Sequence, residues 1–127
     1  MKTLGIGVDI IENHRIKNLA KNKNFINRIF SKKEILNSKS IKNKMFYYSK
    51  RFAAKESFAK ALGLGFRKGL NFKDIEIFND KFGKPYYNTN YKVKRIIQKT
   101  FKIKKFNLFL SIADEKNYSI AFTIIES

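Results

Sequence analysis

The 127-residue sequence contains no cysteine, no tryptophan and only one proline, and these absences limit what the protein can be. Without cysteine there is no disulfide framework, no thiolate metal site and no cysteine nucleophile. A metal site must therefore use oxygen ligands or the single histidine, His14. Carboxylate oxygens suit hard cations such as Mg²⁺. One proline and six glycines argue against long linkers, so we expect one domain over residues 1–127.

Long apolar runs are also missing. No stretch approaches the roughly 20 consecutive apolar residues that a bilayer-spanning helix needs. The N-terminus has one lysine and then a short apolar run that Asp9 interrupts, which is not the pattern of a signal peptide. We therefore expect a soluble, cytoplasmic protein without a membrane partner.

Acidic residues are scarce, with 10 Asp and Glu against 28 Lys and Arg, which gives a net charge of +18. Such a charge attracts polyanions, which include nucleic acid, an anionic membrane, a phosphate-rich ligand or an acidic protein. The alternative is a solvated surface with no dedicated partner. Five of the basic residues are arginine and 23 are lysine, and the lysines are spread along the whole chain, which favours this second interpretation.

Hydrophobic periodicity predicts a mixed α+β domain in which an antiparallel sheet packs against one long helix and shorter helices. In the first predicted strand, Gly5 and Gly7 indicate close approach of another backbone or a ligand. Ser31 and Glu34 have the capping-box spacing, which predicts a helix beginning at Ser31. Gly63 is expected to end the long helix, which should have a wide apolar face. We expect strands at 4–11, 74–78, 85–87, 106–112 and 118–125, and helices from 13, from 31, over 41–62 and over 91–100.

Two acidic residues stand in unusual surroundings. Asp9 lies inside an apolar strand, where a carboxylate needs a partner or a metal. Glu56 lies on the long helix four residues before Lys60, and this spacing alone favours an exposed ion pair over a catalytic pair. If Asp9 and Glu56 meet in space, they can hold Mg²⁺ and leave positions open for phosphate oxygens. His14 is expected on a helix surface, and with one histidine a Ser/His/Asp triad has no support.

Four motifs in order resemble those of the holo-acyl-carrier-protein synthases, a family of small phosphopantetheinyl transferases. They cover nearly the whole chain, and their order and spacing match. The motifs are Gly5-Ile-Gly-Val-Asp-Ile-Ile-Glu12 with Arg15-Ile16; Arg51-Phe-Ala-Ala-Lys-Glu-Ser-Phe-Ala-Lys-Ala-Leu-Gly63; Asp74-Ile-Glu-Ile with Asp80 and Gly83-Lys-Pro85; and Ser111-Ile112 with Tyr118-Ser-Ile-Ala-Phe122.

The resemblance implies a reaction and roles for three residues. The family transfers 4′-phosphopantetheine from coenzyme A to a serine of apo-acyl carrier protein in fatty acid biosynthesis, and adenosine 3′,5′-bisphosphate is released. Asp9 and Glu56 match its Mg²⁺ ligands. Glu56, or a water that it orients, would accept the serine proton. Lys60 would stabilise the departing phosphate as a point charge.

The resemblance also implies substrate-binding residues and an assembly. Arg15, and less directly Arg28, match the basic region that docks the acidic carrier protein, and the family forms homotrimers with active sites between protomers. Asp114 stands where the family commonly has histidine, and it would repel phosphate unless a lysine or the metal offsets it. The residues that match the coenzyme A site are Arg51, Lys60, Gly63, Gly83, Lys84 and Pro85.

Two other functions stay open at this point. A basic domain that binds single-stranded nucleic acid would use charge and aromatic stacking, and it would not need Asp9 or Glu56. A trimeric scaffold without activity is the other alternative, because of Asp114. The lysine-rich segment 91–105 has no assigned role.

Overall fold

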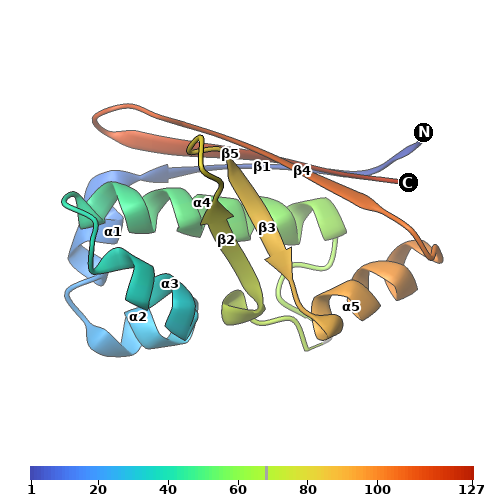
Figure 1. The fold of residues 1–127 in the computed structure, drawn as a ribbon, viewed down its shortest axis with the longest axis horizontal. Coiled ribbons are helices and arrows are strands. Elements are labelled where there is room, and N and C mark those ends of the chain that lie inside the picture. Colours follow the sequence, from blue (N-terminus) through green and yellow to red (C-terminus); the bar gives the residue numbers. More distant parts are fainter. Residues whose placement is uncertain (68) are drawn as a thin grey trace.

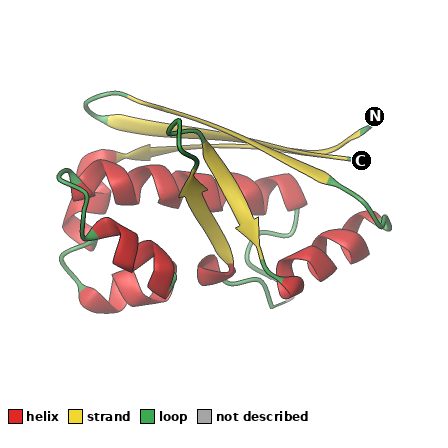
Figure 2. Cartoon of the chain, viewed as in Figure 1, coloured by secondary structure: helices red, strands yellow, loops and turns green. Residues whose placement is uncertain are grey.

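The computed structural model describes residues 1–67 and 69–127, and Figure 1 shows the order of its helices and strands. The strands are β1 (Thr3–Glu12), β2 (Ile75–Asn79), β3 (Pro85–Thr89), β4 (Asn107–Asp114) and β5 (Tyr118–Glu126). The helices are α1 (Asn13–Leu19), α2 (Lys23–Ile29), α3 (Lys32–Ser38), α4 (Lys44–Leu62) and α5 (Tyr91–Phe101), with a 3-10 turn η1 (Phe72–Asp74). The predicted α+β class, with one long helix against antiparallel strands, is confirmed (Figure 2).

The strands form two antiparallel sheets. One has the order β1–β5–β4, and the other consists of β2 and β3. Both hairpins expected from the sequence are present, but the pairing of β1 with β5 joins the two ends of the chain and was not predicted. Main-chain hydrogen bonds between Lys2 and Ser127 close this pairing, and the termini lie side by side (Figure 1).

Helix α4 runs along one face of the three-stranded sheet (Figure 1). Asn43 caps its first turn by accepting a hydrogen bond from the Phe46 N–H at 3.3 Å, and Gly63 ends it with a left-handed φ of 78°, as predicted. The expected wide apolar face is an incomplete description. Residues on nearly all sides of the helix are buried, because the sheet, the β2–β3 hairpin and the helices α1–α3 surround it.

The predicted close approach at Gly5 and Gly7 is a contact with α4. A Cβ atom on Gly7 would overlap the carbonyl oxygen of Ser57, and one on Gly5 would overlap the carbonyl oxygen of Ala61. The two glycines therefore let β1 lie directly against the helix backbone. This contact places Asp9, further along β1, beside the second half of α4.

The short helices α1–α3 pack at the N-terminal end of α4 (Figure 1). The capping box at Ser31 is confirmed, since its hydroxyl accepts from the Glu34 N–H at 3.2 Å and a Glu34 carboxylate oxygen accepts from the Ser31 N–H at 3.0 Å. Helix α2 was not predicted. His14 is exposed on α1, as expected. Of the helices in the described part of the chain, none has the length and apolar composition that a membrane span requires.

Candidate active site

A first cluster of charged groups lies where β1 meets α4. Asp9 is on β1, and its carboxylate accepts a hydrogen bond from the Lys60 ammonium at 3.0 Å. The same ammonium also donates to the main-chain oxygen of Val8 at 3.1 Å. The spacing-based expectation of a Glu56–Lys60 ion pair is therefore wrong for the residues that the structure describes, because Lys60 pairs with a strand distant in sequence.

The carboxyl of Glu56 is in an environment that disfavours its charge. Burial raises its pKa first, and the negative charge of Asp9 raises it further, while Lys60 and Arg15 oppose both effects. The influence of Asp9 shows that the two carboxylates predicted as metal ligands are close enough to interact. The structure thus brings together Asp9, Glu56 and Lys60.

Two carboxylates that repel one another fit a hard divalent cation, which would neutralise both. Within residues 1–67 and 69–127, no group of three or more Asp, Glu or His side chains is arranged to hold a metal. Any ion held by Asp9 and Glu56 would need its remaining oxygen ligands from substrate and water. This is the usual manner of Mg²⁺, which keeps several waters and binds substrate phosphates.

A second cluster surrounds Arg51, on a different side of α4. The residue is only 7% exposed. Its Nη2 donates to the side-chain oxygen of Asn79 at 2.7 Å, its Nη1 donates to the Tyr47 main-chain oxygen at 3.5 Å, and its guanidinium carbon lies 3.7 Å from the centre of the Tyr47 ring. Its Nε has no partner, and no carboxylate of the described residues forms an ion pair with it.

Burying a cation without a counter-ion is costly, and burial lowers the pKa of Arg51. An anionic ligand would offset this cost. Arg51 also borders a cavity of about 120 Å³ between α4, the β2–β3 hairpin and β4. The lining residues are Lys50, Arg51, Ile77, Asn79, Gly83, Pro85, Ile112 and Asp114.

This small cavity contains part of the predicted coenzyme site. Arg51, Gly83 and Pro85 line it. Lys84 is exposed, and its main chain belongs to the predicted turn, where its N–H donates to the carboxylate of Asp80 at 2.9 Å. Gly63 does not line the cavity and lies at the end of α4, three residues beyond Lys60.

Asp114 lies at the rim of the same cavity, beside a lysine. Its carboxylate is 4.0 Å from the Lys50 ammonium, and both side chains are 36% exposed. The sequence suggested that an aspartate here would repel phosphate unless a lysine offset it. Lys50 is in the position to provide that offset.

The two arginines predicted to dock a protein partner line another, larger cavity of about 790 Å³. The arginines are Arg15 on α1 and Arg28 on α2, and apolar side chains form much of the remaining surface. Those apolar residues are Leu19, Phe25, Ile29, Phe52, Phe66, Leu70 and Phe72. Because Arg15 also acts on the charge of Glu56, this groove adjoins the first cluster.

Helix geometry separates the first cluster from the Arg51 cluster. Glu56 and Arg51 are five residues apart, and five residues rotate a helix about 140° beyond one full turn. The two side chains therefore leave α4 in different directions. Within one copy of the chain, the Asp9–Glu56–Lys60 cluster therefore lies apart from the cavity that Arg51 lines.

Sequence reasoning missed three residues around Arg51. The contact of Tyr47 with Arg51 could have been predicted, because the two residues are four apart on the predicted helix and such pairs share a face. The contacts of Lys50 with Asp114 and of Asn79 with Arg51 could not have been predicted, because each joins residues that are distant in the sequence.

A sequence model of the 4′-phosphopantetheinyl transferase superfamily matches residues 5–123. The chain belongs to this superfamily. It is 60% identical over 126 residues to a holo-[acyl-carrier-protein] synthase of Pelagibacter ubique, and the match covers 99% of this chain and 98% of that protein. The chain is thus a phosphopantetheinyl transferase of the holo-acyl-carrier-protein synthase type, as the four motifs predicted.

Solved structures of this superfamily agree. The holo-[acyl-carrier-protein] synthase of Neisseria meningitidis has a TM-score of 0.89 at 34% identity, covering 99% of this chain and 100% of that one. The enzyme of Bacillus anthracis, described as a complex with CoA (3′,5′-ADP), has a TM-score of 0.81 at 34% identity, covering 98% of this chain and 97% of that one. The predicted fold is therefore confirmed along the chain.

Proposed function

We propose that the chain transfers 4′-phosphopantetheine from coenzyme A to a serine of apo-acyl carrier protein, with adenosine 3′,5′-bisphosphate as the second product and fatty acid biosynthesis as its context. The observation that carries the proposal is the meeting of Asp9, Glu56 and Lys60 where β1 crosses α4. A basic module that binds only nucleic acid has no use for this group. The cytoplasm is the compartment that we propose for the reaction.

Asp9 and Glu56 are the residues that would hold Mg²⁺. When bound, the ion supplies positive charge that neutralises the phosphoryl group in transfer. Glu56, or a water that it orients, accepts the proton of the serine hydroxyl. Burial and the charge of Asp9 raise the pKa of this carboxyl above its ordinary value, which strengthens it as a base. Lys60 places its ammonium against the departing phosphate, and its bond to Asp9 keeps it at the site until then.

The Arg51 cavity is our proposed site for a phosphate of the nucleotide part of coenzyme A. The buried guanidinium without a counter-ion supports an anionic ligand there. Lys50 offsets the negative charge of Asp114, so the aspartate does not leave the rim of the cavity negative. Gly83 and Pro85 shape one wall of the cavity. Lys60, Gly63 and Lys84 are further contacts that the family resemblance suggests.

We propose a homotrimer in which one protomer supplies the Asp9 cluster and its neighbour supplies the Arg51 cavity. The outward face of the three-stranded sheet supports this assembly, because it is apolar and exposed, as expected of a protein interface. Its exposed large apolar residues include Ile6, Val8 and Ile10 on β1, Phe109 on β4, and Ile120 and Phe122 on β5, at 39–58% exposure.

Val8→Lys tests the trimer. A lysine among these apolar side chains is expected to convert a species with the sedimentation of three chains into one chain. It should also abolish transfer, because each proposed site needs two protomers. The matched control is Lys2→Ala, at an exposed position outside the sheet, which should remain trimeric. A monomeric wild-type protein with full activity would contradict the shared site.

Carrier protein is expected to dock at the groove that Arg15 and Arg28 line. The carrier is an acidic helical bundle, so arginines beside apolar side chains suit both its charge and its packing surface. The groove adjoins Glu56, which is where the acceptor serine must arrive.

Mass spectrometry of apo-acyl carrier protein incubated with coenzyme A tests the function. We expect addition of phosphopantetheine that stops when a chelator removes divalent metal and resumes with Mg²⁺. Arg28→Glu should raise the KM for carrier protein and leave the KM for coenzyme A unchanged. Binding of RNA with a steep salt dependence, without coenzyme A binding or transfer, would instead favour a nucleic-acid module.

A further inference from the structure

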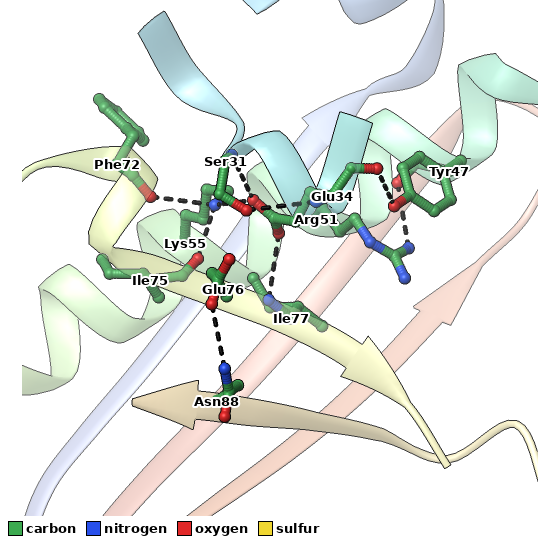
Figure 3. A network of polar contacts seen from close by, with 10 residues as sticks. All are labelled: Ser31, Glu34, Tyr47, Arg51, Lys55, Phe72, Ile75, Glu76, Ile77 and Asn88. Atoms are coloured by element: carbon green, nitrogen blue, oxygen red, sulfur yellow. Dashed lines mark hydrogen bonds and ion pairs between the residues drawn. The ribbon is translucent and has the colours of Figure 1, made fainter. Parts of the chain in front are cut away.

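Arg51 is held by contacts with Tyr47 and Asn79 that involve none of the proposed catalytic groups, and Figure 3 shows the contact with Tyr47. One side of its guanidinium lies against Tyr47, through the ring at 3.7 Å and the main-chain oxygen at 3.5 Å. The other side donates to Asn79 at the end of β2. The Asn79 amide in turn donates to the Gly83 main-chain oxygen at 2.9 Å, which ties the arginine to the turn of the proposed coenzyme cavity.

Tyr47 is itself held by a contact with α3. Its hydroxyl donates to the main-chain oxygen of Glu34 on α3 at 2.6 Å, and the side chain is buried. Burial raises the pKa of Tyr47 to about 12, so the phenol stays neutral and keeps this proton to donate. The ring is thus anchored through its hydroxyl, and the guanidinium lies over its face.

Glu34 connects the two supports of Arg51. Its main-chain oxygen accepts the hydrogen bond from the Tyr47 hydroxyl. Its carboxylate accepts a hydrogen bond at 3.1 Å from the N–H of Ile77 on β2, two residues before Asn79. Figure 3 shows these contacts converging on one fully buried glutamate. Glu34 therefore links the two elements that carry Tyr47 and Asn79, the side chains that contact Arg51.

We infer that Tyr47 is a positioning residue for coenzyme A, because it holds the Arg51 guanidinium as a preformed anion-binding group facing the cavity. The inference rests on the proposed function, in which Arg51 contacts the nucleotide part of coenzyme A. Preorganisation reduces the side-chain ordering that binding must otherwise include. Stacking on an aromatic face also stabilises a desolvated guanidinium. Without the ring, Arg51 would have to be ordered by the ligand itself.

Tyr47→Leu tests this role in the full-length protein. We expect the KM for coenzyme A and the Kd for adenosine 3′,5′-bisphosphate to rise by about tenfold, the size of a lost buried cation–π contact. The kcat at saturating coenzyme A and the KM for carrier protein should stay unchanged, because Tyr47 lines neither the Asp9 cluster nor the carrier groove. Tyr47→Phe keeps the ring over Arg51 and should recover most of the affinity. Tyr47→Met serves the same purpose should the leucine variant fold poorly.

Tyr48→Leu is the matched control. Tyr48 is the next residue on α4, is equally buried, and also bonds α3, through the Ser38 hydroxyl at 2.9 Å. Its loss should destabilise the protein without changing the KM for coenzyme A, because a smaller folded fraction lowers apparent kcat and not KM. An unchanged KM in Tyr47→Leu, or an equal rise in Tyr48→Leu, would overturn the inference.

Arg51→Met separates this inference from the proposed function. If Arg51→Met weakens coenzyme A binding and Tyr47→Leu does not, the positioning role is wrong and the coenzyme site stands. If Arg51→Met binds coenzyme A normally, the assignment of the cavity fails, and the inference fails with it.

Discussion

Replacing Glu56 with glutamine is expected to lower kcat for phosphopantetheine transfer by about 10²–10⁴-fold, the range for loss of a general base. Glutamine keeps the size of the side chain but neither accepts the serine proton nor gives a metal a charged ligand. The fold should survive, since Glu56 is only partly buried and its environment already disfavours the charge. Single-turnover transfer to apo-acyl carrier protein measures the loss of rate, and circular dichroism on the same samples shows whether the variant is folded.

The variants Asp9→Asn and Glu76→Gln complete this test. Asp9→Asn removes the other proposed ligand and the partner of Lys60, so a loss of similar size is expected. Glu76 is a partly exposed residue on β2 that accepts a bond from the Asn88 amide, and Glu76→Gln should transfer normally. Normal transfer by both Asp9→Asn and Glu56→Gln would show that the assigned mechanism is wrong.

Lys55→Met is expected to lower the free energy of unfolding by about 3–5 kcal/mol, the cost of leaving one member of a buried ion pair alone. The Lys55 ammonium is fully buried and donates to the Glu34 carboxylate at 2.7 Å. It also donates to the main-chain oxygens of Phe72 at 2.9 Å and Ile75 at 2.6 Å (Figure 3). Burial lowers the pKa of Lys55, and the negative charge of Glu34 opposes this shift. The charged state of the buried lysine therefore depends on its contact with Glu34.

An ion pair at the surface with a similar nitrogen–oxygen distance is the control. Lys92 and Asp74 are 2.8 Å apart, but 44% of the lysine side chain is exposed, and Lys92→Met should cost less than about 1 kcal/mol. Adding Glu34→Gln to Lys55→Met removes the unpaired charge and should recover part of the loss. Urea unfolding at one protein concentration measures the set. Equal effects of Lys55→Met and Lys92→Met would contradict the role of burial.

The local features of the fold were predictable because each depends on neighbouring residues. The capping box at Ser31, the end of α4 at Gly63 and the two hairpins all follow from short-range spacing. The long helix begins at Lys44 and not at residue 41, since the side chain of Asn43 caps it. Two charged residues of α4, Arg51 and Lys55, are buried, because helices and strands from the rest of the chain surround this helix.

The candidate site was predictable only in part. The family motifs identified Asp9, Glu56 and Lys60, but helix spacing favoured the wrong partner for Lys60. The buried Glu34–Lys55 pair joins residues 21 apart, and no local pattern indicates that their side chains meet. Glu34 has two roles. Its capping box with Ser31 is local and could be predicted, whereas its ion pair with Lys55 depends on the tertiary structure and could not.

The contact of Gly5 and Gly7 with α4 has a consequence for how this protein can change over generations. Because main-chain atoms touch there, the separation between the strand that bears Asp9 and the helix that bears Glu56 does not depend on the size of any side chain between them. Substitutions on the outer surface, including most of the 23 lysines, leave that separation unaltered. Amino-acid usage can therefore drift widely over the surface while the spacing of the two carboxylates is inherited unchanged.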